Sequence, residues 1–233
     1  MCSAGVTRES HGRERRSADA MLEAETGRLS MEYLVTMTTR VPGGTPAEEV
    51  DAVRAKESAH TRELAAQGRV LRLWRPPLGP GEWRTIGLFT ADDPDDLERT
   101  LARMPLRIWR TDEPVPLGVH PNDPGPGAVP ASMSDTEFLV TLVVRVPDGA
   151  APATVEETFA RETARARELA AEGHLVRLWR LPGEGRNLGV FRAADGARMD
   201  EILRALPLAD WLTVETVPLT RHPSDPGATL IPG

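Results

Sequence analysis

Two glutamates occupy equivalent positions on the apolar faces of two predicted helices. Glu57 lies seven residues after Val50 and seven before Leu64, at the centre of an apolar stripe. Glu162 is at the centre of a second stripe, formed by Val155, Phe159, Ala166 and Leu169. A carboxylate on the buried side of a helix is costly unless it is paired or used. Burial also raises its pKa, which suits a general base. The alternative is an internal ion pair with an arginine.

Two arginines and two tryptophans recur in a pair of short predicted strands. The segments RVLRLWR (69–75) and HLVRLWR (174–180) place Arg72 with Trp74, and Arg177 with Trp179, on one strand face. That face is expected to meet a second sheet or a cavity, where an arginine could bind a substrate carboxylate. The alternative, which the residues alone favour, is that each arginine stacks on its tryptophan and pairs with an acid across an interface.

The opposite face of these strands is expected to form a helix-packed core. It carries Leu71 and Leu73 in the first strand, and Val176 and Leu178 in the second. With regular pleating, the helix glutamate and the strand arginine of each unit lie on opposite sides of one sheet. They could then meet only through an edge, a bulge or the other unit.

Further polar candidates lie near the ends of predicted strands. Asn187 and its counterpart Thr85 share a strand face with glycine and phenylalanine, where the glycines either leave space or allow close packing. His120 and His222 each precede a proline just after a last strand. A loop histidine is more often unremarkable than functional, and neither has metal-ligand spacing to a neighbour. The chain has one cysteine, Cys2, and no phosphate loop, serine elbow or zinc motif, so we expect no metal site.

These residues belong to an internal repeat. EYLVTMTTRVP (32–42) matches EFLVTLVVRVP (137–147), and RELAAQG (62–68) matches RELAAEG (167–173), both at an offset of 105. After the first tryptophan the offset falls to 102, because the following loop is three residues longer in the first copy. GEWRTIGLF (81–89) then matches GEGRNLGVF (183–191).

Each repeat has a readable order of elements. In the first, we expect strands at 33–41, 70–75, 83–90 and 111–117, and helices at 46–67 and from about 93 to 104. Thr45 looks like the cap of the first helix, and the prolines of the last strand suggest an edge. The order βαββαβ is the ferredoxin-like pattern. One unit leaves a sheet face uncovered, so we predict an α+β protein whose two units pack as an internal pseudo-dimer.

Composition limits the partners and the compartment. Residues 1–30 are expected to be a flexible arm with a short helix at 19–25, 31–121 the first unit, 122–134 a Pro/Gly-rich linker, 135–225 the second unit and 226–233 a tail. The net charge of −7 argues against nucleic acid. No apolar run approaches the ~18 residues that span a membrane. A cytoplasmic protein is the simplest interpretation. A homo-oligomer is compatible with the internal pseudo-dimer, as is a monomer.

Taken together, these motifs resemble the muconolactone δ-isomerase family. The resemblance rests on the Leu-Val-Thr-Met strand, the helix with Lys56-Glu57 and Glu63-Leu64, the Gly-x-x-x-x-Leu-Trp-Arg join and the closing Pro-Leu…His-Pro. It covers about 31–123 and again 137–225. It implies single ferredoxin-like units of the dimeric α+β-barrel type that associate into larger rings. It also implies a cofactor-free shift of a double bond in a small unsaturated lactone, part of aromatic catabolism. Such chemistry needs a base, a donor for the dienolate and a clamp for the substrate carboxylate.

The resemblance assigns roles and also shows departures. Glu57 and Glu162 match the family's helix glutamate, and Asn187 matches its asparagine, which is Thr85 in the first unit. This favours the second unit as the active one, with Glu162 and also Glu57 as base, Asn187 as dienolate donor and Arg177 or Arg72 as clamp. The further substrate-binding residues expected are Trp74, Trp179, His120 and His222. The chain departs from the family at three positions of each unit. Threonine replaces the family's arginine at Thr36 and Thr141, Arg72 and Arg177 replace its histidine, and His60 and Arg165 replace its tyrosine.

Three functions are therefore open. The first is an isomerase acting on a small unsaturated acid or lactone. The second is a non-catalytic small-molecule-binding or scaffold protein with a diverged pocket, and the third is a cofactor-free oxygenase of the dimeric α+β-barrel group. A cavity that touches both Glu162 and Arg177 would favour an enzyme, and a filled interior would favour the second function.

Overall fold

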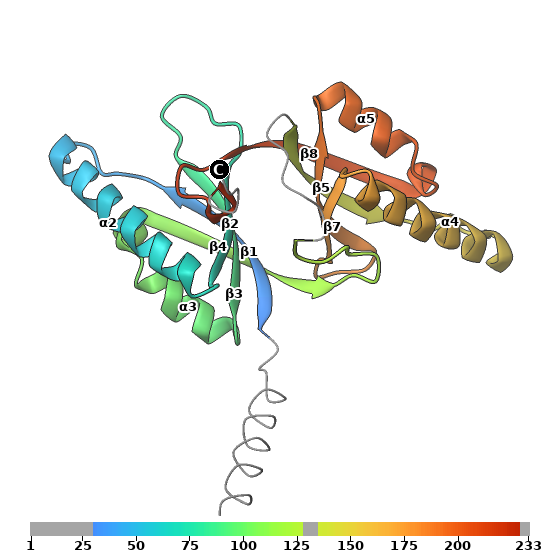
Figure 1. Ribbon diagram of the computed structural model, residues 1–233, viewed down its shortest axis with the longest axis horizontal. Coiled ribbons are helices and arrows are strands. Elements are labelled where there is room, and N and C mark those ends of the chain that lie inside the picture. The colour runs from blue at the N-terminus through green and yellow to red at the C-terminus, as the bar shows by residue number, and fades with distance from the viewer. Residues whose placement is uncertain (1–29, 128–134, 229–233) are drawn as a thin grey trace, which may run out of the picture. The chain divides into compact units, whose positions relative to one another are not determined.

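The computed structural model describes residues 30–127 and 135–228, which form two similar halves (Figure 1). The first half contains β1 (Met31–Thr39), α2 (Ala47–Ala66), β2 (Val70–Arg75), β3 (Arg84–Ala91), α3 (Pro94–Ala102), η1 (Pro105–Trp109) and β4 (Arg110–Val119). The second contains β5 (Thr136–Val144), α4 (Pro152–Ala171), β6 (Leu175–Arg180), β7 (Arg186–Ala193), α5 (Gly196–Arg204), η2 (Ala209–Trp211), β8 (Leu212–Arg221) and the 3-10 turn η3 (Pro226–Ala228). The predicted arm up to residue 29, its helix at 19–25, and parts of the predicted linker and tail lie outside the described residues.

The eight strands close into one barrel in the order β1-β3-β2-β8-β5-β7-β6-β4. In each half, the first strand lies between the third and fourth strands and pairs antiparallel with both. The ends of β4 and β8 then cross over: Gly118 and Val119 pair with β6, while β8 pairs with the end of β2. The predicted α+β fold, two ferredoxin-like units packed as an internal pseudo-dimer, is confirmed.

Three apolar cores hold this arrangement. Outside the barrel, α2 and α3 cover the first half's strands, and α4 and α5 cover those of the second half (Figure 1). Leu64 and Leu101 anchor the first of these cores, and Leu169 the second. The third core is the barrel interior, where Trp74 and Trp179 pack among aliphatic side chains of both halves. Each half therefore buries its inner sheet face against the other half.

A bulge in β2 and in β6 corrects one prediction. The pairing register with β3 shifts between Val70 and Arg72, and β6 shifts in the same way. Because the bulge breaks the two-residue alternation, Leu71 and Val176 pack against the barrel interior, whereas the prediction placed them in the helix-packed core. Leu73 lies on the helix side, as expected.

The residues predicted to begin and end the helices are confirmed only in part. Asp93 caps α3, accepting a hydrogen bond from the backbone N–H of Asp96 at 2.7 Å. The prediction that Thr45 caps α2 was wrong, because the Thr45 hydroxyl donates to the Pro42 carbonyl and the helix starts after Pro46. Gly68 follows α2 with φ of 71°, a conformation that favours glycine. In the described part of the chain, no helix combines the length and the apolar character needed to cross a membrane.

The strand glycines allow close packing. A Cβ on Gly87 would lie 2.4 Å from the Phe89 ring, and one on Gly189 would lie 2.3 Å from the Phe191 ring. Each phenylalanine therefore folds over the glycine two residues before it and fills the space beneath the helices. The sequence left open whether these glycines leave space or allow close packing, and the structure shows close packing.

Candidate functional site

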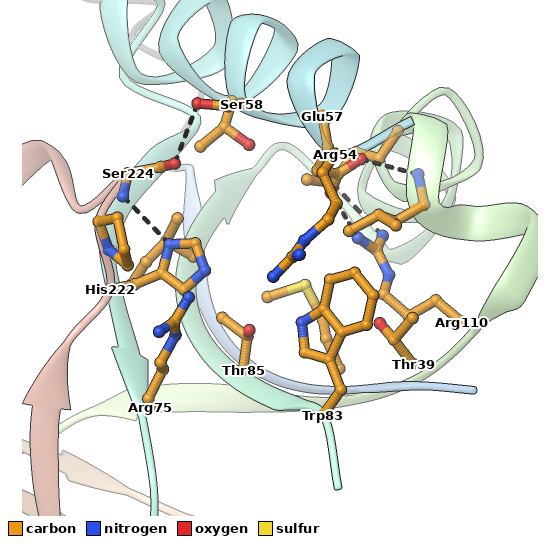
Figure 2. A pocket seen from close by; sticks show the side chains of 16 residues that line it. Thr39, Arg54, Glu57, Ser58, Arg75, Trp83, Thr85, Arg110, His222 and Ser224 are labelled. Atoms are coloured by element: carbon orange, nitrogen blue, oxygen red, sulfur yellow. Dashed lines mark hydrogen bonds and ion pairs between the residues drawn. The ribbon is translucent and has the colours of Figure 1, made fainter. Parts of the chain in front are cut away.

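Each half has a pocket between its long helix and its sheet. The first pocket has a volume of about 220 Å³ and is lined by α2, by strands of its own half and by the segment after β8. Its polar side chains are Thr39, Arg54, Glu57, Ser58, Thr61, Arg75, Thr85, Arg110, His222 and Ser224, and Trp83 closes one side (Figure 2). The predicted Glu57 and His222, which are far apart in the sequence, thus share one pocket.

Both oxygens of Glu57 are occupied. Arg110 donates from Nη1 to Oε1 at 2.8 Å, and the backbone N–H of Leu106 donates to Oε2 at 2.8 Å (Figure 2). The Arg110 side chain is only 2% exposed and also binds Asp112, with Nε 2.6 Å from Oδ1. Glu57 is therefore a member of a buried ion-pair network, with both of its carboxylate oxygens already engaged.

The second pocket holds Glu162 in a different environment. It has a volume of about 200 Å³ and equivalent walls, but Leu212 stands where the first pocket has Arg110, Phe159 replaces Arg54, and Val144 replaces Thr39. Glu162 accepts one hydrogen bond, from the backbone N–H of Leu208 at 3.1 Å. Burial among these apolar side chains raises the pKa of Glu162, and that single hydrogen bond only partly offsets the effect.

The second pocket also contains further polar side chains beside Glu162. Asn187, Arg180 and His120 line it together with Glu162. The backbone N–H of Asn122 donates to His120 Nδ1 at 3.1 Å, and burial followed by the nearby Arg180 charge lowers the pKa of His120. A neutral His120 therefore carries its proton on Nε2, where it can donate a hydrogen bond. Among the described residues, Arg180 forms no ion pair.

The histidines are exchanged between the halves. His120 follows β4 of the first half but lines the pocket of the second, and His222 follows β8 but lines the pocket of the first. This exchange results from the crossover of β4 and β8 to the opposite sheet. Each pocket is therefore completed by the other half, so neither repeat alone forms the whole site.

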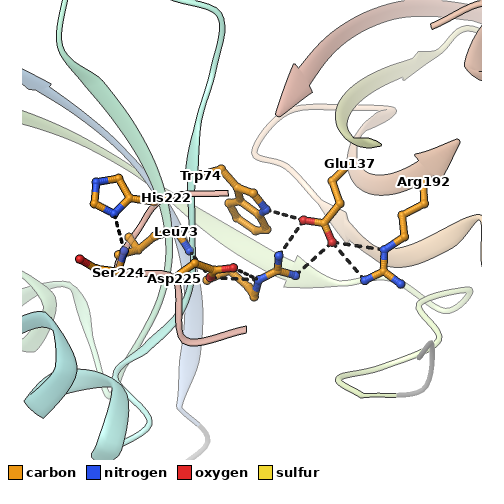
Figure 3. Close-up of polar contacts among 8 residues, drawn as sticks. Leu73, Trp74, Glu137, Arg192, His222, Ser224 and Asp225 are labelled. Carbon is orange, nitrogen blue, oxygen red and sulfur yellow. Dashed lines mark hydrogen bonds and ion pairs between the residues drawn. The ribbon is translucent and has the colours of Figure 1, made fainter. Parts of the chain in front are cut away.

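The predicted Arg72 and Trp74 lie elsewhere, in the contact between the halves. Arg72 donates to Glu137 Oε2 at 2.6 Å and to Asp225 Oδ1 at 3.2 Å, and its guanidinium lies 4.8 Å from the Trp74 ring centre. In Figure 3, the Glu137 carboxylate lies between Trp74 and Arg192, both of which donate to it. Burial alone would raise the pKa of Glu137, but the Arg72 charge and these hydrogen bonds outweigh it, and the pKa is lowered.

Arg177 and Trp179 repeat this arrangement. Arg177 donates to Glu32 Oε2 at 2.7 Å and to Asp123 Oδ1 at 3.2 Å, and Trp179 Nε1 donates to Glu32 at 2.6 Å. Both strand arginines thus stack on a tryptophan and each meets two carboxylates of the other half. A cavity of about 390 Å³ in the barrel interior includes Arg72 and Arg177, but neither glutamate of the two pockets lines it. Glu162 and Arg177 therefore line different cavities.

The sequence matches a known family twice. The family model described as muconolactone delta-isomerase matches residues 31–123 and 136–225. The chain belongs to the muconolactone delta-isomerase family. Its two matched segments contain the two halves of the barrel, so two family domains occur here in one chain.

Relatives in this family match one domain each. Muconolactone Delta-isomerase of Rhodococcus opacus is 35% identical over 88 residues, which cover 38% of this chain and 95% of the relative. Muconolactone Delta-isomerase 1 of Acinetobacter lwoffii is 37% identical over 87 residues, covering 37% and 91%. Among solved structures, a mutant chlorite dismutase from Candidatus Nitrospira defluvii covers 83% of this chain and 92% of its own, with a TM-score of 0.58 and 11% identity. That likeness extends to the fold alone.

The structure adds pocket residues to those predicted. Arg75 and Arg180 follow the repeated tryptophans and match the family's Trp-Arg, which was a signal for them in the sequence. Arg110 and Leu212, which distinguish the two glutamates, carried no such signal. They are 53 and 50 residues from their glutamates, and only the turn before β4 or β8 brings them close.

Proposed function

We propose that this member of the muconolactone delta-isomerase family is a cofactor-independent isomerase whose reaction takes place in the second pocket. The substrate class is a small unsaturated lactone or acid. The observation that carries the proposal is the state of Glu162: a carboxylate with one hydrogen bond, a raised pKa and apolar neighbours. A group of this kind can accept a proton near neutral pH and return it.

The reaction moves one proton and one double bond. Glu162 removes a proton from a carbon conjugated with the carbonyl, and the electron pair of that C–H bond passes into the carbonyl system to give a dienolate. The protonated Glu162 then delivers the proton to another carbon of the dienolate, so the product is an isomer and the carboxylate is regenerated. No electron acceptor is required, since nothing is oxidised or reduced.

The other polar groups of the pocket have complementary roles. His120, neutral and protonated on Nε2, and the Asn187 amide can donate hydrogen bonds to the developing oxyanion. Arg180 can bind a substrate carboxylate, because no carboxylate among the described residues neutralises it. This assignment transfers the clamp from Arg177, whose guanidinium is engaged by Glu32 and Asp123.

A direct assay tests the substrate class. Purified protein is mixed with muconolactone, and the ultraviolet spectrum is followed, because moving the double bond changes its conjugation with the carbonyl. We expect a spectral change that shows saturation with substrate concentration. Absence of turnover with muconolactone and with other unsaturated lactone acids of similar size would contradict the proposal.

A further inference from the structure

The first pocket differs from the second by an excess of positive charge. Arg54 and Arg75 extend from α2 and β2 towards a common space, which Trp83 and His222 border (Figure 2). At the equivalent positions the second pocket has Phe159 and Arg180. Besides Arg110, which is paired with Glu57, the first pocket thus has the cation Arg54 where the second has the aromatic Phe159.

Neither arginine is neutralised strongly. Arg54 pairs with Asp51, 3.7 Å from its Nη1, on the helix surface, where the two side chains are 52% and 76% exposed. Exposed pairs of this kind contribute little. Arg75 forms no ion pair with any described residue, and Glu57 is engaged by Arg110 and Leu106. The pocket therefore carries two positive charges that are available to a ligand.

His222 supports this view of the charge. Burial and then the charges of Arg75 and Arg54 lower the pKa of His222 to about 4, with Asp225 opposing them. The backbone N–H of Ser224 donates to its Nδ1 at 3.1 Å, so a neutral His222 carries its proton on Nε2. His222 is then a further hydrogen-bond donor beside the two arginines.

The remaining walls indicate the kind of anion. Met37, Leu73 and Met104 give the pocket an apolar floor, and its volume is about 220 Å³. Arg54 stacks on Trp83, with its guanidinium carbon 4.8 Å from the ring centre. Two arginines from different elements, in a pocket that also has apolar lining, suit two carboxylates joined by a short carbon chain better than a compact inorganic anion.

We propose that the first pocket binds a small organic dicarboxylate and does not transform it. Glu57, the equivalent of the proposed base, is held in an ion pair, so bound ligand would meet no free proton acceptor. The two halves would then have separate tasks, ligand binding in the first and proton transfer in the second. Ligand binding in the first pocket does not require turnover in the second.

Calorimetric titration of the full-length protein tests the proposal, with three probes. Adipate has two carboxylates on a six-carbon chain, hexanoate has one on a chain of the same length, and inorganic phosphate is a compact anion. We expect adipate to bind and to bind more tightly than either of the others. Equal affinity for phosphate, or no heat with adipate, would overturn the proposal.

Matched variants locate the site. Arg54→Gln and Arg75→Gln should each weaken adipate binding at least about tenfold, because each removes a charge-assisted contact. Arg180→Gln, the counterpart of Arg75→Gln in the second pocket, should leave the tight adipate site unchanged. Loss of binding in Arg180→Gln with retention in Arg54→Gln would place the anion in the second pocket and refute the proposal. Thermal unfolding of each variant separates loss of the site from loss of the fold, and Arg54 is exposed enough to be replaced without unfolding.

Discussion

Arg110 Nη1 lies 2.8 Å from Glu57 Oε1. This ion pair distinguishes Glu57 from Glu162, the residue at the equivalent position of the second repeat. In the second half, Leu212 takes the place of Arg110, and Val214 takes the place of its other partner, Asp112. Glu162 is left with one backbone hydrogen bond and a raised pKa. One carboxylate is thus held in a buried ion pair, while the other, the base of the proposed reaction, forms no ion pair within the described residues.

The same substitution should change stability in opposite directions in the two halves. Glu57→Gln removes the partner of a buried guanidinium and should lower the free energy of unfolding by about 1–3 kcal/mol, with Asp112 limiting the loss. Glu162→Gln should raise the free energy of unfolding at pH 7. Because the folded-state pKa of Glu162 is raised, its favourable contribution is complete below the ordinary value near 4.5 and is lost as pH rises through the raised pKa. Urea unfolding at pH 7 measures both, and equal effects would contradict the assignment.

Introducing into the second pocket an ion pair like that of the first should abolish the proposed activity. In Leu212→Arg, a guanidinium replaces the apolar neighbour of Glu162, as Arg110 neighbours Glu57. The pKa of Glu162 should fall, and kcat/KM should drop by about tenfold or more, because the carboxylate becomes a weaker base. Leu212→Met, which keeps the volume and adds no charge, is the control. Full activity in Leu212→Arg would show that the environment of Glu162 does not govern the reaction.

The pH dependence of kcat/KM should report the raised pKa of Glu162. A general base acts in its deprotonated form, so kcat/KM should rise with pH through a value above 4.5 and then reach a plateau. His120 should add no limb near neutral pH, since burial and the Arg180 charge lower its pKa and keep it neutral there. In Glu162→Gln the acid limb should disappear from the residual activity. An unchanged limb in that variant would assign it to another group.

Arg177 should act on stability and leave the chemistry unaffected. Arg177→Met leaves Glu32 and Asp123 without their shared cation and should cost about 3–5 kcal/mol, the range for breaking a buried pair. Under conditions where the variant is folded, kcat/KM should be within about threefold of the wild-type value. Circular dichroism melting and kinetics on the same sample measure the two effects. A large rise in KM without loss of stability would restore Arg177 as a substrate clamp.

The sequence repeat predicted the fold well because most of what defines it is local. Strand alternation, Asp93 at the start of α3 and Gly68 after α2 are each visible within a few residues. The bulge in β2 was not visible, since Val70-Leu71-Arg72 reads as ordinary alternation. Its effect was to move Leu71 into the barrel interior.

The candidate site was predictable only in part. The position of Glu57 and Glu162 on apolar helix stripes placed them on the sheet side, and the Glu57 side chain is 12% exposed. The pocket partners depend on contacts between segments far apart. His120 enters the second pocket because β4 crosses to β6, and this pairing joins strands from different repeats. Periodicity within one repeat carries no information about such a contact.

The most direct test of the account is the kcat/KM for isomerisation of the two matched variants, measured on one lactone substrate at pH 7. Glu162→Gln should lose roughly 10²- to 10⁴-fold, the usual contribution of a positioned general base. Glu57→Gln, checked to be folded at the assay temperature, should remain within about threefold of wild type. The reverse pattern, or equal losses in both, would contradict the claim that proton transfer belongs to the second pocket.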